Sequence, residues 1–311
     1  MPERSTGLHA FAVLTAVATF VLLFVGGLVT STGSGLAVPD WPLSFGQVFP
    51  AMVGGVLFEH GHRLAATLVG CLTVVLALWT VIGDTRPSVR ALGLFALLAV
   101  VLQGVLGGVT VLYKLPLAVS VTHACLAQAF FCLTVALATV TGRRWTAPRP
   151  CIAPSALPVV AGVTTGLVFG QLVLGALMRH MGAGLAIPDF PLALGRVIPP
   201  LASPYIQVHF AHRVGALVVA LALMATVTVA RRSDPWLRRP ALLALALVAL
   251  QVTLGALTIW SRRAVIPTTT HVVVGAGILA TCLVLTLRAA RMSVGRMPAA
   301  APIRLGGRAL A

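Results

Sequence analysis

The sequence predicts an all-α, polytopic membrane protein in which eight transmembrane helices form two duplicated four-helix bundles. Three observations predict this fold class. Of the 311 residues, 59% are hydrophobic and only 9% are charged, whereas soluble proteins contain about 25% charged residues. Eight apolar runs are each long enough to cross a hydrocarbon core of about 30 Å. In addition, a segment of 25 residues occurs twice in similar form.

The apolar runs set the order of the elements. Helices are expected because lipid cannot satisfy free backbone groups and because the runs are too long for barrel strands. The spans are predicted near residues 8–30, 60–82, 91–112, 117–141, 156–178, 207–230, 240–260 and 267–288. The first run is too long for a signal peptide and lacks a clean cleavage pattern, so we interpret it as a membrane span.

The basic residues indicate the orientation of the chain. With the N-terminus inside, fifteen of the 22 Lys and Arg residues fall in cytoplasmic segments and five in outside segments. The positive-inside rule therefore predicts both termini in the cytoplasm. The net charge of +16 then reflects topology and attraction to anionic lipid headgroups, and a nucleic-acid partner is not expected.

The duplication relates residues 26–50 to residues 175–199, which share 13 of 25 residues without a gap. Each copy is followed by a His-Arg pair and later by a lone histidine. These residues are His62, Arg63 and His123 in the first half, and His212, Arg213 and His271 in the second. Because both halves start inside and hold four spans, the repeat is parallel, with an axis along the membrane normal.

The repeat divides the chain into four parts. These are an N-terminal half at 1–142, a cytoplasmic connector at 143–155, a C-terminal half at 156–290 and a basic cytoplasmic tail at 291–311. Four of the five cysteines lie in predicted spans and Cys151 lies in the connector, so no disulfide framework is predicted. Glycine-rich stretches such as QGVLGG and QVTLGAL are typical of close helix packing, with glutamines that can bond across helices.

The four paired histidines are candidate metal ligands. All fall in the first turns of helices that run from outside to inside, so they share a depth near the outer face. Ionisable residues in spans usually face the bundle interior or a functional cavity. A zinc or copper site needs three or four clustered donors, whereas two facing imidazoles in a four-helix bundle suit bis-histidine haem ligation. The alternative is a buried histidine that only bonds to a neighbouring helix.

One acidic residue distinguishes the halves. Glu59 precedes His62 by three residues, which puts both on one helical face, while His209 takes this place in the second half. A carboxylate beside a haem ligand can act as a general base or proton relay. The alternative is a solvated residue at the helix start. For Asp40 and Asp189 of the repeated loop, a turn-stabilising role is favoured over binding of charge.

The chain resembles haem A synthase, the family that oxidises haem O to haem A for cytochrome oxidases. The residues that carry the resemblance are GGLVTSTGSGLAVPDWPLS, EHGHRLAATLVG, VTHA around His123, RHMGAGLAIPDFPLALGRVIPP, VHFAHRVGA and PTTTHVVVGAG around His271. The resemblance covers essentially all eight spans. Some members carry cysteine pairs in the outside loops, which this chain lacks, so no role of such cysteines is carried over.

The resemblance implies roles for individual residues. His62 and His123 match the pair at the substrate haem site, Glu59 matches the essential glutamate, and His212 and His271 match the pair that ligates haem b. The reaction is oxidation of the C8 ring methyl of haem O, through hydroxylated intermediates, to the formyl group of haem A. A bacterial-type plasma membrane is implied, with the haem sites toward the extracytoplasmic face. Haem O synthase and an electron donor are candidate partners.

Haem propionates would need cationic partners near the outer face. Arginines that qualify by position are Arg63, Arg213, Arg262 and Arg263. For Arg63 and Arg213, snorkelling to the headgroups is an equal alternative. Histidines without an assigned role are His9, His60 and His180. Two rival functions stay open at this point: a di-haem b-type electron-transfer protein, which would not need Glu59 on one side only, and a transporter, which would not bind haem.

Overall fold

The computed structural model describes residues 2–147 and 154–294. Within these residues, eight helices are long and apolar enough to cross a membrane, so the predicted fold class is confirmed. They are α1 (Pro2–Ser31), α2 (Gly55–Gly83), α3 (Pro87–Leu112), α4 (Leu117–Thr141), α6 (Leu157–His180), α7 (Pro204–Ala230), α8 (Pro235–Trp260) and α9 (Val265–Val294). Two short elements accompany them, α5 (Arg143–Thr146) and the 3-10 helix η1 (Ala183–Leu185).

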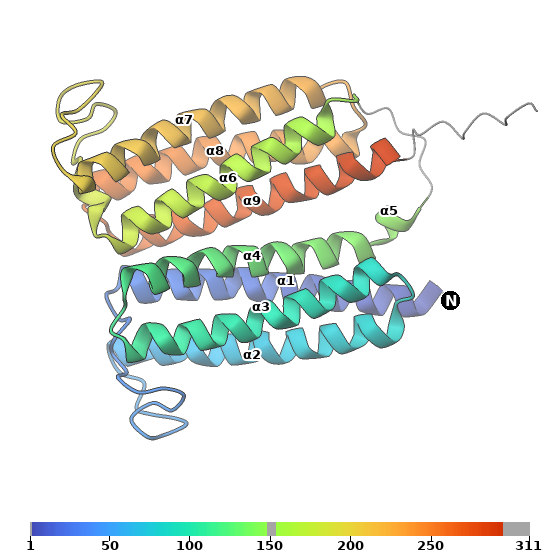
Figure 1. The fold of residues 1–311 in the computed structure, drawn as a ribbon, viewed down its shortest axis with the longest axis horizontal. Coiled ribbons are helices and arrows are strands. Elements are labelled where there is room, and N and C mark those ends of the chain that lie inside the picture. Colours follow the sequence, from blue (N-terminus) through green and yellow to red (C-terminus); the bar gives the residue numbers. More distant parts are fainter. Residues whose placement is uncertain (1, 148–153, 295–311) are drawn as a thin grey trace, which may run out of the picture.

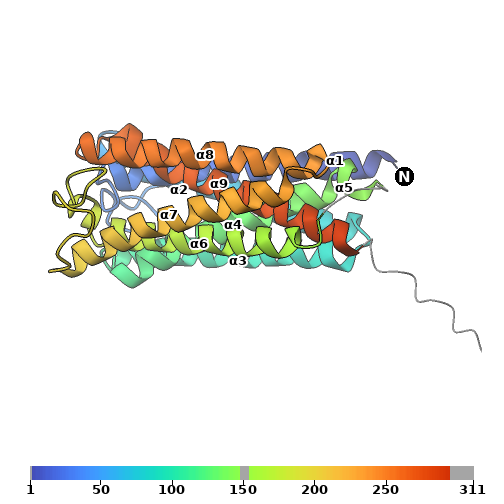
Figure 2. The same cartoon turned by 90° about the horizontal axis from the view of Figure 1, so that it is seen from above.

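The long helices pack as two rings, one from each half of the chain (Figure 1). In the first ring, α1 and α3 each contact α2 and α4; in the second, α6 and α8 each contact α7 and α9. The rings meet where α9 contacts α1 and α4, and where α4 contacts α6. Figure 2 shows that the long helices run roughly along one axis. Each histidine-bearing helix therefore has a neighbour on both sides within its own ring.

Each ring has its own buried apolar core. Leu76 of α2 and Leu137 of α4 are fully buried in the first ring, and Leu223 of α7 is fully buried in the second. Lipid tails are as apolar as leucine, so these contacts stabilise the rings through close packing rather than through exclusion of water. The cores hold the helices that carry the histidines in a fixed register.

The two ends of the molecule differ. Long loops, residues 32–54 and 181–203, join α1 to α2 and α6 to α7 at the left end of Figure 1. The other end holds the start of α1, the short helix α5 and the end of α9. The duplicated segments thus form the ends of α1 and α6 and most of the two loops, and His62 and His212 lie in the helical turns that follow these loops. His123 and His271 lie in the first turns of α4 and α9.

Several helices begin earlier than hydropathy predicts. Helix α2 begins at Gly55 rather than near residue 60, and α8 begins at Pro235 rather than near residue 240. Proline suits the first helical position, and Asp234 caps α8 by accepting the Trp236 N–H at 2.7 Å. Polar residues, Glu59 and His60 in α2 and Arg238 and Arg239 in α8, lower the hydropathy of first turns that are nevertheless helical. Glu59 therefore lies inside α2 rather than before it.

Parts of two predicted segments lie outside the described residues. The connector begins with α5, but residues 148–153, which include Arg149 and Cys151, are not described, and neither is the tail from residue 295. The cysteines in the described part of the chain are free thiols, namely Cys71, Cys125, Cys132 and Cys282.

Candidate functional site

The two loops share one backbone conformation at matching positions. The Asp40 carboxylate accepts hydrogen bonds from the backbone N–H groups of Phe45 and Gly46 at 2.7 and 2.8 Å. The Asp189 carboxylate accepts the two equivalent bonds in the second loop, also at 2.7 and 2.8 Å. These bonds lower the pKa of both carboxyl groups below the ordinary value of 3.8. Both aspartates thus have the turn-stabilising role that the sequence predicts.

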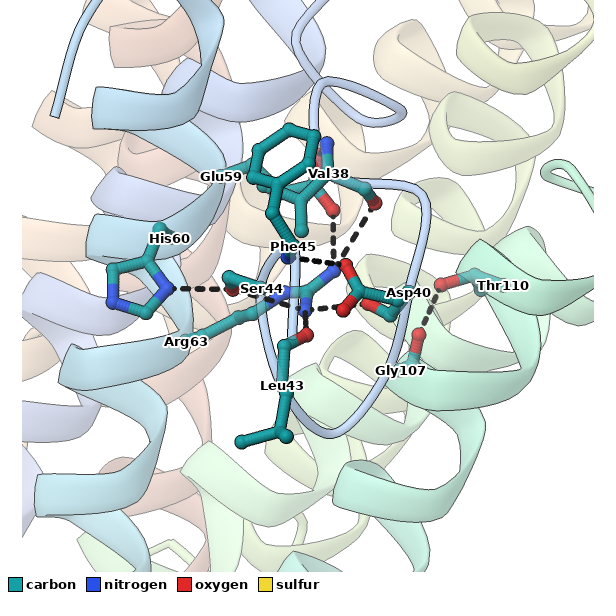
Figure 3. Close-up of polar contacts among 10 residues, drawn as sticks. All are labelled: Val38, Asp40, Leu43, Ser44, Phe45, Glu59, His60, Arg63, Gly107 and Thr110. Atoms are coloured by element: carbon teal, nitrogen blue, oxygen red, sulfur yellow. Dashed lines mark hydrogen bonds and ion pairs between the residues drawn. The ribbon is translucent and has the colours of Figure 1, made fainter. Parts of the chain in front are cut away.

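Arg63 of α2 fastens the first loop to the helix beneath it (Figure 3). One terminal nitrogen donates to the backbone carbonyls of Asp40 and Leu43 at 2.7 and 2.8 Å, and the other donates to the Val38 carbonyl at 3.3 Å. Arg213 of α7 donates to the three equivalent carbonyls of the second loop at 2.7 to 3.0 Å. Both guanidinium groups therefore bind loop backbone. A role of these two arginines toward propionates stays a prediction.

Glu59 is buried beneath the first loop, with an exposed fraction of 4%. One carboxylate oxygen accepts the Val38 N–H at 2.8 Å, and the other pairs with the Arg63 guanidinium at 2.8 Å (Figure 3). The alternative of a solvated residue at the helix start is therefore wrong, because the loop covers the side chain. Two charge-assisted hydrogen bonds fix the position of this carboxylate, as general-base chemistry requires.

His209 takes the place of Glu59 in the second half. It is 3% exposed, and its Nδ1 lies 3.3 Å from the backbone nitrogen of Ile187 and 3.1 Å from the backbone oxygen of Ala183. Ile187 is the equivalent of Val38, so Glu59 and His209 meet the loop at the same backbone position. An imidazole can anchor the loop there, but it supplies no carboxylate to pair with an arginine.

A further polar pair exists in the first half alone. The Ser44 hydroxyl lies 2.8 Å from Nδ1 of His60, and both residues are buried. Arg63 also donates to the Ser44 hydroxyl at 3.4 Å, so Glu59, Arg63, Ser44 and His60 form one connected polar cluster (Figure 3). The equivalent positions in the second half are Ala193 and Phe210. The sequence alone assigned no role to His60. The signal for this pair is that Ser44 and His60 are both replaced by apolar residues in the second half.

Each of the four histidine rings lies against a glycine of a neighbouring helix. The distances from a Cβ built on the glycine to the imidazole Cε1 are 3.0 Å for Gly26 and His62, 3.3 Å for Gly107 and His123, 3.1 Å for Gly175 and His212, and 3.3 Å for Gly255 and His271. Real Cβ contacts this short are rare. The glycines predicted to let helices approach therefore also make room for the imidazole rings.

The histidines of the second half face each other across their ring of helices. The imidazole centroids of His212 and His271 are 6.3 Å apart. A metal–imidazole bond is about 2 Å long, so two imidazoles on opposite sides of one iron have centroids about 6 Å apart. Among the described residues, no three His, Cys, Asp or Glu side chains gather as a metal site. The donor set here is an imidazole pair, and its spacing fits bis-histidine haem ligation.

In the first half, His62 and His123 lie close enough to interact electrostatically, and His180 of α6 also interacts with His123. The Nδ1 atoms of His62 and His123 are buried without a hydrogen-bond partner among the described residues. Unpaired buried polar atoms are rare in folded proteins and call for a bonding partner. This pair fits a site that a further ligand completes.

Glutamines connect the histidines to neighbouring helices, as the sequence suggests. The Gln103 side-chain nitrogen donates to the His123 carbonyl at 3.0 Å. The Gln171 side-chain nitrogen donates to the His212 carbonyl at 2.7 Å and lies 3.0 Å from Nδ1 of the same residue. The equivalent of Gln171 in the first half is Leu22. His212 therefore has a neighbour at Nδ1 that restrains its ring, whereas Nδ1 of His62 has no hydrogen-bond partner among the described residues.

The turn between α8 and α9 carries the other two predicted arginines, Arg262 and Arg263. Both residues adopt left-handed backbone conformations, with φ of 51° and 68°. The Arg263 side chain lies near Gly184 of the second loop, where the first half has Leu115 near Gly35. The second half therefore has an additional cation beside its loop. A role toward propionates stays a prediction for both arginines.

Arg179 is a residue at the junction of the halves that sequence reasoning missed. It lies on α6 and donates to the Gly27 carbonyl and the Ser31 hydroxyl of α1, both at 2.9 Å. Two other basic residues, His271 and Arg263, lie near it. Its position in the repeat corresponds to Thr30, and that change of residue type was the available signal.

Comparisons with known proteins agree with the resemblance described above. The sequence pattern of the COX15-CtaA family, described as cytochrome oxidase assembly protein, matches residues 9–283. The chain is 39% identical over 259 residues to a Heme A synthase of Symbiobacterium thermophilum, with 78% of this chain and 82% of the relative covered. It is 32% identical over 239 residues to a Heme A synthase of Halalkalibacterium halodurans, with 72% and 77% covered. A Heme A synthase of Geobacillus kaustophilus is 29% identical over 300 residues, with 91% and 93% covered.

Proposed function

Because the chain belongs to the COX15-CtaA family of cytochrome oxidase assembly proteins, we propose that it is a membrane-bound oxidoreductase of the haem A synthase type. The reaction is oxidation of the C8 methyl of haem O, through hydroxylated intermediates, to the formyl group of haem A. The product supplies haem A-containing cytochrome oxidase. A porphyrin with a long apolar tail is a substrate that suits a site within the bilayer.

The first half holds the substrate haem in this proposal. His62 and His123 bind the substrate iron, and Glu59 acts as the catalytic acid–base group on the same face of α2 as His62. Two observations support this assignment. Nδ1 of His62 and Nδ1 of His123 have no hydrogen-bond partner among the described residues. The Glu59 carboxylate is buried and bonds to Arg63 and to the loop backbone. The loop excludes water from the Glu59 carboxylate, and the lower local dielectric strengthens the electrostatic attraction between this carboxylate and a nearby proton.

The second half holds a resident haem b between His212 and His271. Support comes from the 6.3 Å separation of their imidazole centroids. Nδ1 of His271 also lies 3.1 Å from the backbone oxygen of Gln251, the kind of acceptor to which a ligating imidazole donates its other N–H. A haem bound there supplies one-electron transfer. Arg262 and Arg263 are the propionate partners most consistent with the structure, because Arg63 and Arg213 already bind loop carbonyls.

Both haem sites face the extracytoplasmic side in this proposal, because the positive-inside rule assigns the opposite end to the cytoplasm. The candidate partners, an electron donor and the haem O-producing enzyme, therefore serve haem sites that lie near the extracytoplasmic side of the membrane.

The observation that carries the proposal is the presence of a buried, paired carboxylate beside only one of two equivalent histidine pairs. The test is to co-express the full chain with a haem O source in a host that lacks haem A, and to extract the haems. Formation of haem A or its hydroxylated precursor is expected. A purified protein with a haem b spectrum but neither product would instead be a di-haem electron-transfer protein. A protein without any haem absorbance would contradict both.

A further inference from the structure

A cavity of about 600 Å³ lies at the end of the molecule opposite the four paired histidines. Its walls come from α1 and α4 of the first half, from α5 of the connector, and from the start of α8 and the end of α9 in the second half. It therefore sits between the two rings, at the end that also holds the start of α1 (Figure 1). The candidate haem chemistry does not use it.

The deep part of the cavity is an apolar groove. Val13, Val17 and Phe20 line it from α1, and Phe131 and Val135 line it from α4. The rings of Phe20 and Phe131 are 5.6 Å apart and close its far end. From Thr6 to Phe20 the groove follows α1 for roughly 21 Å at 1.5 Å per residue. Half of a bilayer that is about 40–45 Å thick with its headgroups has the same depth.

The mouth of the cavity is basic and aromatic. Its charged members are Arg143, Arg144 and Arg288, and no acidic residue is among the described residues that line the cavity. Arg143 donates to the Thr6 hydroxyl at 2.9 Å, which holds its guanidinium at the rim. Arg288 lies over the ring of Trp236, 4.9 Å from the centroid, and donates to the Trp236 carbonyl at 2.9 Å. His9, which has no role in the haem sites, lies on the same rim.

We propose that this cavity binds an anionic phospholipid from the leaflet on the side of the chain termini. The phosphate lies against Arg143 and Arg144, and one acyl chain lies in the groove between α1 and α4. Basic pockets between transmembrane helices on the cytoplasmic side are a recurring site for anionic headgroups, and arginine forms paired hydrogen bonds with phosphate oxygens. An anionic phospholipid suits the cavity better than two other ligands. Inorganic phosphate would leave the apolar groove empty, and a zwitterionic lipid has no net negative charge to neutralise the arginines at the mouth.

Such a lipid would join the two halves of the molecule. The groove belongs to α1 and α4, whereas Trp236, Val284 and Arg288 of the second half close its other side. The halves otherwise pack against each other mainly where α9 contacts α1 and α4 and where α4 contacts α6. The bound lipid therefore acts as a shared packing element at the end far from Arg179, which joins the halves near the loops.

The headgroup part is tested by native mass spectrometry of the full chain, titrated in detergent with phosphatidylglycerol or phosphatidylcholine. Preferential retention of phosphatidylglycerol is expected. The double variant Arg143→Ala, Arg144→Ala is expected to lower that affinity roughly 25-fold, since each basic residue near an anionic lipid contributes about fivefold. The matched control is Arg231→Ala, Arg232→Ala, which removes two exposed arginines at the same end but outside the cavity. Equal losses in both double variants would overturn the proposal.

The acyl-chain part is tested with a substitution in the groove. Val17 lines the cavity and is 55% exposed, whereas Val101 of α3 is also 55% exposed but does not line the cavity. Val17→Trp is expected to lower phosphatidylglycerol retention about tenfold by filling the groove, and Val101→Trp to leave it unchanged. Unaltered retention in Val17→Trp, or displacement of the lipid by millimolar inorganic phosphate, would show a site for a phosphate group alone and would overturn the proposal.

Discussion

The two halves of the molecule share a loop, a pair of histidines and a glycine against each histidine, yet they differ in the side chains beneath the loop. The loops match in the bonds of their aspartates to backbone N–H groups and in the bonds of the following arginines to loop carbonyls. The differences are Glu59 against His209, Ser44 against Ala193, and His60 against Phe210. All three lie where the loop meets the following helix, so the divergence is confined to one layer of the structure.

This comparison separates what holds the site together from what gives it chemistry. The loop anchor persists when Glu59 is replaced by His209, because both side chains bond to the same backbone position. The ion pair with an arginine does not persist. The polar cluster of the first half is therefore more than the fold requires, whereas the glycines and the loop bonds are requirements of the fold itself.

The largest expected effect is that of Glu59→Gln. Glutamine keeps an oxygen for the Val38 N–H but loses the charge, so haem A formation should fall by at least about 100-fold, the usual contribution of a general acid or base. Haem b content should not change. The product is measured by haem extraction, and His209→Gln is the matched control that should retain activity. Normal haem A formation by Glu59→Gln would remove this carboxylate from the mechanism.

Alanine at the glycines beside the histidines should give smaller, half-specific effects. Gly26→Ala puts a Cβ 3.0 Å from His62, and Gly175→Ala puts one 3.1 Å from His212. Overpacking of this kind costs about 1–3 kcal/mol. We expect Gly26→Ala to lower haem A formation about tenfold at normal haem b content, and Gly175→Ala to lower haem b content.

The control for these two variants is Gly70→Ala, because a Cβ at Gly70 meets nothing within 4 Å. Haem b is measured from reduced-minus-oxidised spectra and haem A from extracts. If Gly26→Ala and Gly175→Ala both lowered haem b equally, the division of roles between the halves would be contradicted.

The pair of Ser44 and His60 should contribute about 1–2 kcal/mol to stability. His60→Phe alone leaves the buried Ser44 hydroxyl with only the 3.4 Å bond from Arg63, whereas Ser44→Ala with His60→Phe reproduces the arrangement of the second half. We therefore expect the double variant to lose less stability than the sum of the single variants. The readout is the free energy of unfolding in detergent. Strict additivity would show that the two side chains are independent.

Acid should act equally on both loops. The pKa values of Asp40 and Asp189 lie below 3.8 in the folded protein, so each carboxylate stabilises its loop above about pH 4, and this contribution is lost as the pH falls through the folded pKa. The protection factors of the Phe45 and Leu194 amides against hydrogen exchange, taken relative to the intrinsic rate at each pH, should fall together below that pH. Asp40→Asn should raise exchange in the first loop alone; an unequal response of the unmodified loops would contradict their equivalence.

The fold was predictable because each span is long, apolar and duplicated, so hydropathy and the repeat agree. Helix starts were less predictable, since Glu59 and His60 in α2 and Arg238 and Arg239 in α8 interrupt the apolar runs although they lie inside helices. The paired histidines and Glu59 followed from register in the repeat. The contact of Ser44 with His60 did not, because it depends on the path of a loop that brings together positions 16 residues apart.

The functions of individual arginines were also beyond the sequence. Arg63 and Arg213 have outer-face positions that suit propionate binding, yet their guanidinium groups bind carbonyls of the loops. Arg179 looked like one of several outside cations, and its bonds to α1 arise only when the two rings pack together. Long side chains near a membrane surface can reach several partners, so spacing alone does not select among them.

The central claim is that the halves are unequal, with a resident haem b in the second half and the substrate site in the first. The most direct test is the haem b content per chain of purified His212→Leu and His62→Leu, determined from pyridine haemochrome spectra. The account predicts that His212→Leu loses haem b and that His62→Leu keeps the content of the unmodified protein. Loss of haem b in His62→Leu with retention in His212→Leu would contradict it.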